Sequence, residues 1–159
     1  MLTQGEKQTV TPLHNLSDTV GQMKRLIDSY YEDMRFSQTM SLQEIHDFLK
    51  FHVPYVRDGI LGSIRGLSEE QFNAEVLQRP AITLQRGGDC DDKVIAAASY
   101  CKLKNIPYVI VTTSYRPDKE MEHVYLYIWY GGTWQPFDVT MKSVNIFQEL
   151  PYTAHEVWR

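Results

Sequence analysis

The segment from Cys90 to Lys104 is the feature that most limits what this chain can fold into. It is rich in alanine, and at about 100° per residue its apolar side chains cover nearly the whole circumference of a helix. Asn105 can adopt the left-handed conformation that ends a helix, and Pro107 follows it. A helix that is apolar nearly all round and carries small side chains lies in the centre of a domain. The rest of the chain is therefore expected to cover it.

The chain that follows this helix predicts an antiparallel sheet. Residues 108 to 114 are rich in β-branched side chains and indicate a buried strand. The stretches HVYLYIWY and TWQPFDVT flank Gly131-Gly132, which is the pattern of a β-hairpin. Helices, then one buried helix, then an antiparallel sheet indicate an α+β fold.

Two further helices are predicted near the N-terminus. Apolar residues at strict spacings of three and four form a narrow helical stripe: Leu13, Leu16, Val20, Met23, Ile27, Tyr30 and Met34. Asn15 or Ser17 could cap the start of this helix. The stripe either docks on the chain's own domain or contacts a partner, including a second copy, because it is narrower than a usual docking face.

A capping box, Ser41-Leu42-Gln43-Glu44, begins the second of these helices, which is expected to end near Phe51. Residues 59 to 86 are expected to be mostly irregular. A helical turn is predicted after Ser68, and Pro80 is expected to end it.

The bulk properties describe an ordinary globular protein. The chain has 159 residues, enough for one domain, and a formal net charge of −4 without a densely basic stretch, which argues against nucleic-acid binding. Its longest apolar run is far shorter than the roughly 20 residues of a membrane span, and the N-terminus lacks a secretion-signal pattern. On one helix, Cys90 and Cys101 would lie about 16 Å apart, too far for a disulfide, so the compartment is predicted to be reducing. Cys101 lies in the middle of the helix without a histidine nearby in sequence and is predicted to be structural.

Counting residues outward from the Gly131-Gly132 turn gives the strand pairing of the hairpin, and this pairing brings a histidine close to a carboxylate. A two-residue turn puts Tyr130 opposite Thr133, so His123 and Asp138 point to the same face as diagonal neighbours, about 7–8 Å apart at Cα. Cys90 lies in the first turn of its helix, where N–H groups and the positive helix end favour a thiolate and can bind an oxyanion. A nucleophile, a base and an orienting carboxylate make up a catalytic triad.

The sequence GGDCDD places three aspartates around Cys90, and their charge disfavours its thiolate. Asp89 could cap the helix, and Asp91 and Asp92 suit its positive end. A protonated His123 in contact with the sulfur is expected to outweigh these carboxylates and lower the Cys90 pKa. A buried structural thiol and a metal site formed by Asp91, Asp92 and His123 are the alternatives, although zinc prefers more Cys or His ligands and calcium more oxygen ligands. Four other histidines have no comparable neighbouring residues in the predicted structure and are assigned no role: His14, His46, His52 and His155.

Four stretches in this order resemble the Cys-His-Asp core of the transglutaminase-like superfamily: GDCDDK, NIPYVIV, EHVYLYI and GGTWQPFDVT. The upstream stretches YVRDG and EVLQRPAITLQR resemble a bacterial and phage-associated branch of it. The resemblance covers roughly residues 41 to 140. It implies Cys90 as nucleophile, His123 as base and Asp138 as orienting group, on a cysteine-proteinase fold whose cysteine helix packs on an antiparallel sheet. At Lys93 the sequence departs from the family, which has alanine or a long aliphatic residue there.

The resemblance also implies a function. It implies a cysteine-dependent amide hydrolase or acyl transferase that forms a thioester with a protein or peptide substrate. Such an enzyme is expected to need no cofactor. It is expected to work in the cytoplasm of a bacterium, encoded by the bacterium or by a phage. The alternative is a non-catalytic binding or assembly module on the same fold, such as a phage structural or morphogenesis protein. Gln85 and Tyr55 are the candidates for an oxyanion-binding side chain. Residues 1–40 are expected to form a lead-in and helix, and residues 41–159 the catalytic domain, within one globular unit.

Overall fold

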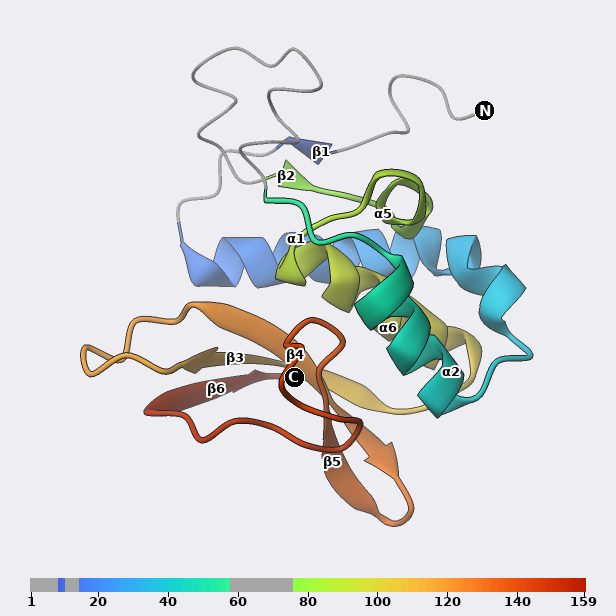
Figure 1. Ribbon diagram of the computed structural model, residues 1–159. Helices are drawn as coiled ribbons and strands as arrows, with labels where there is room; N and C mark the ends of the chain where they lie inside the picture. Colours follow the sequence, from blue (N-terminus) through green and yellow to red (C-terminus); the bar gives the residue numbers. More distant parts are fainter. Residues whose placement is uncertain (1–8, 11–14, 58–75) are drawn as a thin grey trace.

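Helix α6 (Cys90–Leu103) lies between the N-terminal helices and the sheet in the computed structural model, which describes residues 9–10, 15–57 and 76–159 (Figure 1). Every residue from Asp92 to Cys101 is buried, and Asn105 ends the helix with a φ of 56°. The predicted central position of this helix is confirmed, and so is the left-handed stop. Predictions for Leu13, His14 and the turn after Ser68 lie outside the described residues.

The sheet on which α6 packs has four antiparallel strands in the order β5-β4-β3-β6. Their bounds are Tyr108–Ser114 for β3, His123–Tyr130 for β4, Thr133–Phe137 for β5 and Ala154–Trp158 for β6. Helices on one side of an antiparallel sheet make the predicted α+β fold. Two short strands, β1 (Thr9–Val10) and β2 (Val76–Leu77), pair separately beyond the helices.

The hairpin of β4 and β5 has the register obtained by counting. Tyr130 pairs with Thr133 and Leu126 with Phe137. Pro136 is accommodated because β5 is an edge strand, where a missing N–H leaves no partner strand unsatisfied. The strand ends at Phe137, so Asp138 is the first residue after it.

The N-terminal helices are α1 (Leu16–Tyr30), the 3₁₀ helix η2 (Tyr31–Ser37), α2 (Leu42–Asp47) and the π-helix η3 (Phe48–His52). Asn15 caps α1 by accepting a hydrogen bond from the Asp18 N–H at 2.9 Å, and the predicted capping box begins α2. The predicted stripe faces inward, because four of its members are buried: Val20, Met23, Ile27 and Met34. The stripe therefore docks on the chain's own α6, while a partner contact through this helix stays a prediction.

The expectation that residues 59 to 86 are mostly irregular is wrong for the part that the structure describes. Pro80 begins helix α5 (Pro80–Arg86) instead of ending one. Proline suits the first helical position because its φ is already helical and its missing N–H would have no partner there. The cap comes from a distant element: Asp33 in η2 accepts the Ala81 N–H at 3.1 Å and both Nε and Nη2 of Arg79, at 2.8 and 2.7 Å.

Two aspartates on neighbouring turns provide a matched stability test. We expect Asp33→Asn to lower the free energy of unfolding by about 1–3 kcal/mol, because its hydrogen-bonded charge is largely buried and its removal takes a paired carboxylate from Arg79. Asp28→Asn should cost less than about 1 kcal/mol, since its pair with Lys102 is exposed. Urea unfolding measures both, and equal losses would contradict the role of Asp33 as the cap of α5.

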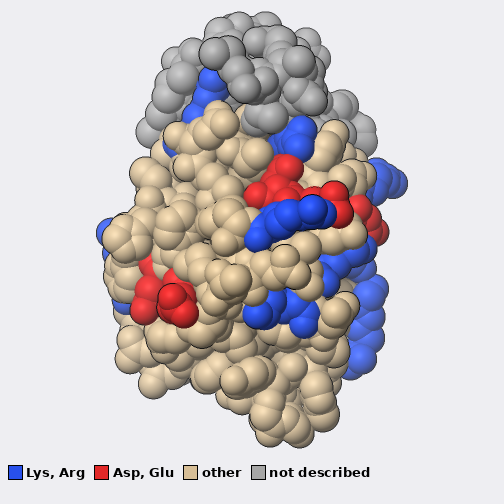
Figure 2. Space-filling view, turned by 90° about the vertical axis from the view of Figure 1, so that its right-hand side faces the viewer, with Lys and Arg blue, Asp and Glu red and all other residues tan. Residues whose placement is uncertain are grey.

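On the face shown in Figure 2, basic side chains of the described residues gather on the right-hand half, with acidic ones among them in its upper part, and a separate acidic patch lies at the lower left. Among residues 9–10, 15–57 and 76–159, no helix is both long and apolar enough to cross a membrane.

Candidate active site

Two glycines hold the start of α6 against the segment after η3. The Gly88 N–H donates to the Pro54 carbonyl at 3.1 Å, and the Val56 N–H donates to the Gly88 carbonyl at 3.0 Å. Gly87 has a φ of +81°, and a Cβ there would lie 2.4 Å from the Pro54 oxygen. A Cβ on Gly88 would lie 2.6 Å from the Cβ of Asp92. Both glycines are thus required by close approach of other atoms.

Two of the three aspartates in GGDCDD form a capping box. The Asp89 carboxylate accepts the Asp92 N–H at 3.4 Å, and the Asp92 carboxylate accepts the Asp89 N–H at 3.2 Å. Asp92 is fully buried and also accepts the N–H of Gln78 at 2.9 Å. The predicted cap at Asp89 is confirmed, and this part of the acidic cluster positions the helix start that carries Cys90.

The thiol of Cys90 faces β4 rather than solvent. Cys90 is a free, half-buried cysteine whose sulfur accepts a hydrogen bond from the backbone N–H of Val124, the residue after His123. Burial raises the pKa of the Cys90 thiol well above its usual range, Asp91 and Asp89 raise it further, and the Val124 N–H only partly opposes them. The expectation of a lowered Cys90 pKa is therefore wrong, because loss of hydration and nearby carboxylates outweigh the helix end.

His123 and Asp138 meet as the hairpin register predicts. His123 Nε2 lies 2.7 Å from Asp138 Oδ2, and Asp138 is only 2% exposed. Burial by itself raises the pKa of the Asp138 carboxyl, but the hydrogen bond and charge of His123 and the N–H groups of Met141 and Thr140 lower it overall. An ionised carboxylate only accepts, so Nε2 carries the proton and Nδ1 of neutral His123 keeps a lone pair.

A second histidine supports Asp138 from the helical layer. His46 Nε2 donates to the Asp138 backbone carbonyl at 2.9 Å, and the His46 ring packs edge-on against Phe137. This buried histidine was assigned no role from the sequence, because its partner is a carbonyl group 92 residues away. It holds the residue that orients His123.

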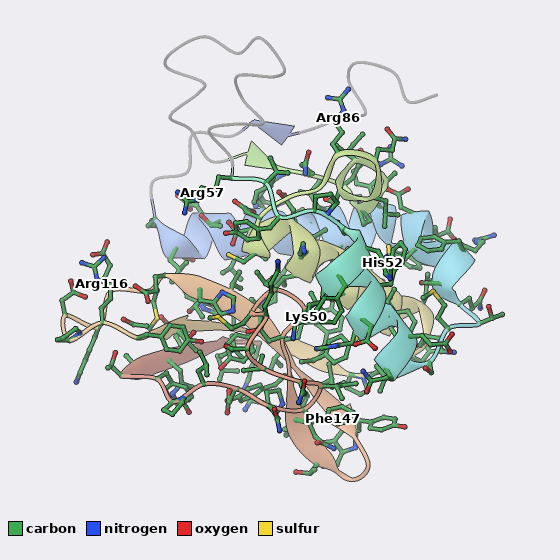
Figure 3. The ribbon with its side chains drawn as sticks, in the orientation of Figure 1. Lys50, His52, Arg57, Arg86, Arg116 and Phe147 are labelled. Carbon is green, nitrogen blue, oxygen red and sulfur yellow. The ribbon has the colours of Figure 1, made fainter. Side chains whose placement is uncertain are left out.

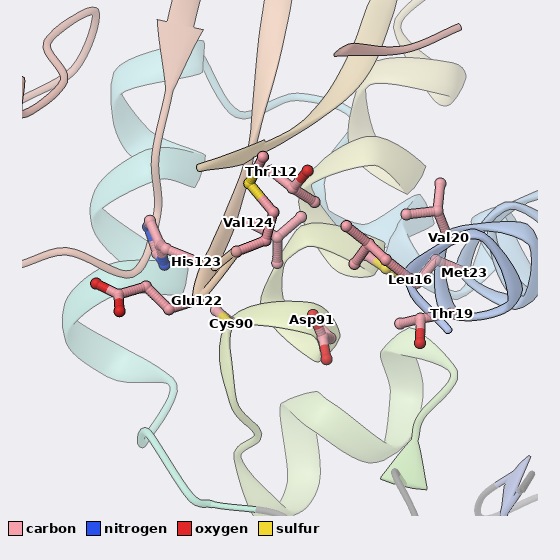
Figure 4. Close-up of a pocket in the computed structure, with 11 residues that line it drawn as sticks. Leu16, Thr19, Val20, Met23, Cys90, Asp91, Thr112, Glu122, His123 and Val124 are labelled. Atoms are coloured by element: carbon pink, nitrogen blue, oxygen red, sulfur yellow. The ribbon is translucent and has the colours of Figure 1, made fainter. Parts of the chain in front are cut away.

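Cys90 and His123 line one cavity of about 180 Å³, shown in Figure 4, together with residues of α1 such as Leu16 and Val20. His123 also lines a second cavity of about 530 Å³, so its ring stands between two hollows. The N-terminal helix thus contributes part of the wall around the thiol.

The two candidate oxyanion residues have different positions. Gln85 is exposed on α5 and lines neither of these cavities, so the fold does not bring it to the thiol. Tyr55 lines the larger cavity beside His123. Burial and then the charge of Cys90 raise the Tyr55 pKa to about 12, so its phenol keeps its proton at neutral pH and can donate it.

The histidine, cysteine and carboxylate side chains do not gather as a metal site in the described part of the chain, where no group of three or more such residues could hold an ion. Asp92, which was weighed as a ligand, is engaged by the backbone of Gln78 and Asp89.

The raised pKa of Cys90 predicts how its alkylation depends on pH. The thiolate is the nucleophile, so the rate with iodoacetamide should keep rising above about pH 8.5, where an ordinary thiol titrates. Cys101 is fully buried, and burial raises its pKa to about 12, so it should stay unmodified in the folded protein. Peptide mass spectrometry distinguishes the two cysteines. A Cys90 rate that is flat between about pH 6 and 9 would show instead a thiolate already formed at neutral pH.

The family described as the transglutaminase-like superfamily matches residues 37–139. Among curated proteins, no sequence matches significantly. A crystal structure named "Putative Cysteine Protease from Cytophaga hutchinsonii" is 18% identical and aligns with 86% of this chain at a TM-score of 0.45. The chain spans 50% of the length of that protein.

Proposed function

Since the chain belongs to the transglutaminase-like superfamily, we propose that it is a cysteine enzyme that hydrolyses amide bonds or transfers their acyl groups, with Cys90, His123 and Asp138 as its catalytic residues. The observation that carries the proposal is the contact of 2.7 Å between His123 Nε2 and Asp138 Oδ2. The same histidine lines one cavity together with Cys90. These groups come from α6, from β4 and from the residue that follows β5, and their roles as nucleophile, base and orienting carboxylate are those of a triad.

The reaction begins from the thiol, because the raised pKa of Cys90 keeps its sulfur protonated. Nδ1 of His123 accepts the thiol proton while the sulfur attacks the amide carbonyl, and Asp138 stabilises the resulting imidazolium. The Cys90 backbone N–H, at the positive end of α6, stabilises the oxyanion. Tyr55, whose phenol stays protonated, is a second donor in this proposal.

Collapse of the tetrahedral intermediate breaks the C–N bond. The His123 imidazolium protonates the leaving amine, and a thioester to Cys90 remains. Attack by water, deprotonated by His123, releases a carboxylic acid and restores the thiol. Attack by an amine gives a new amide instead. Hydrolase and transferase thus differ only in the nucleophile of the second half-reaction.

Trapping the thioester tests this proposal. The protein is incubated with a mixture of N-acetylated peptide p-nitroanilides, quenched in acid and measured by intact mass spectrometry. We expect an acyl adduct that maps to Cys90, is absent in Cys90→Ala and is released by hydroxylamine as a hydroxamate. Faster turnover with hydroxylamine than with water would favour the transferase. A protein that forms no adduct with peptide amides or with activated esters would instead be a binding or assembly module.

A further inference from the structure

The larger cavity beside His123 carries a cluster of lysines that the proposed chemistry does not use. Among the described residues that line it, three are lysines, Lys50, Lys93 and Lys142, and none is acidic. Lys50 extends from η3 and donates to the Val144 carbonyl in the segment after β5 (Figure 3). The cavity thus has a basic wall with His123 at its side.

Lys93 is the member of this cluster that the fold does not explain. The residue is only 2% exposed. Within the described residues its ammonium makes no hydrogen bond or ion pair, yet it is not among the fully buried atoms without a partner, so it opens into the cavity that Lys93 lines. Burial and then the charge of Lys142 lower its pKa to about 8. Burying a lysine without a partner is unfavourable, so a lysine kept in such a place indicates that something else supplies the compensating charge.

A second polar group at the same cavity also has no partner. Thr140 lines the cavity, and its buried hydroxyl makes no hydrogen bond within the described residues. Lys93 and Thr140 thus both line one cavity, and an ammonium and a hydroxyl in such a place suit an oxygen anion, which can accept from both.

The position of Lys93 relates this cavity to the reacting sulfur. Lys93 lies three residues after Cys90 on α6, so their Cβ atoms are about 5–6 Å apart on one helix face. Side chains of an α-helix lean toward its N-terminus, which directs Lys93 back toward the level of Cys90. A group bound by Lys93 would lie next to the scissile bond.

We propose that this cavity is a subsite for a carboxylate of the substrate, held by Lys93, Thr140 and Lys142 beside the thiol of Cys90. The inference rests on the proposed function, and it makes the substrate an acidic peptide or amide. Among the anionic groups that a peptide can present, side-chain and terminal carboxylates fit without further modification.

Two alkylating agents of nearly the same size test the subsite. Iodoacetate and iodoacetamide both alkylate the Cys90 sulfur and release iodide into solution. Only iodoacetate carries a carboxylate. The ratio of their rates at Cys90, measured at about pH 7 and divided by the ratio for glutathione, should fall about fivefold in Lys93→Met. Lys142→Gln, a change of an exposed side chain, should lower it in the same direction. Lys104→Met, at the far end of the same helix, should leave it unchanged. Unchanged ratios in both Lys93→Met and Lys142→Gln would overturn the subsite.

A binding measurement that needs no reaction separates the subsite from the triad. In Cys90→Ser, acetate should raise the melting temperature above the effect of sodium chloride at equal ionic strength, and Lys93→Met should abolish this increment. An increment with inorganic phosphate but not with acetate would overturn the carboxylate assignment. The triad is judged separately by the iodoacetamide rate in His123→Ala, so either proposal can fail while the other stands.

Discussion

Replacing His123 with alanine is expected to lower the rate at which p-nitrophenyl acetate acylates Cys90 by about 100-fold or more. The reason is the raised pKa of Cys90: with burial and three aspartates disfavouring the thiolate, the sulfur depends on a base to take its proton during attack. Single-turnover release of p-nitrophenolate at about pH 7 measures the rate. Circular dichroism should show that the variant stays folded, because His123 lies at the end of β4.

The control for this substitution is His52→Ala. His52 is exposed at the end of η3, stacks on Phe48 and makes no contact with Asp138 in the described structure, so the rate should stay within about twofold of the unmodified protein. His46 does not serve as a control, because it donates a hydrogen bond to the backbone carbonyl of Asp138. Without this bond the Asp138 carboxylate should move away from His123, so His46→Ala should also lower the rate. Equal rates in His123→Ala and His52→Ala would remove His123 from the chemistry.

Replacing Gly87 with alanine is expected to destabilise the protein by about 3 kcal/mol or more. Two costs combine there. A φ of +81° together with a ψ of −179° is a conformation that essentially only glycine adopts, and the new Cβ would lie 2.4 Å from the Pro54 carbonyl oxygen, which belongs to the backbone and cannot turn away. The shift needed to relieve that contact would also disturb the helix start that carries Cys90.

Gly132 supplies a matched control for this clash. Its φ is +82°, nearly the same as that of Gly87, but a Cβ there would meet nothing within 4 Å. Gly132→Ala should therefore cost only about 1–2 kcal/mol, the part due to φ alone. Urea unfolding of both variants measures, as their difference, what the contact with Pro54 and the ψ of −179° add at Gly87. Losses of the same size in the two variants would mean that the turn relaxes without cost.

Local pattern was sufficient for those parts of the fold that depend on one segment or on neighbouring segments. The all-round apolar surface of residues 90 to 103 determined the central helix, since such a helix has no face that can meet water. The turn at Gly131-Gly132 determined the hairpin register, and with it the meeting of His123 and Asp138, because alternation along paired strands leaves one solution once the turn is known. Asn15 and Asp89 were found as caps because a cap and its partner lie within three residues.

What the tertiary structure alone decided involves partners far apart along the chain. Pro80 starts a helix because Asp33, 48 residues before Ala81, caps it. His46 reaches the carbonyl of Asp138 across 92 residues. Burial against β4 raises the pKa of Cys90, although the helix end near it argued for the opposite direction. Hydration, packing distance and electrostatic environment are properties of the assembled fold, so the residues of the site could be named from the sequence, but the protonation state of its thiol could not.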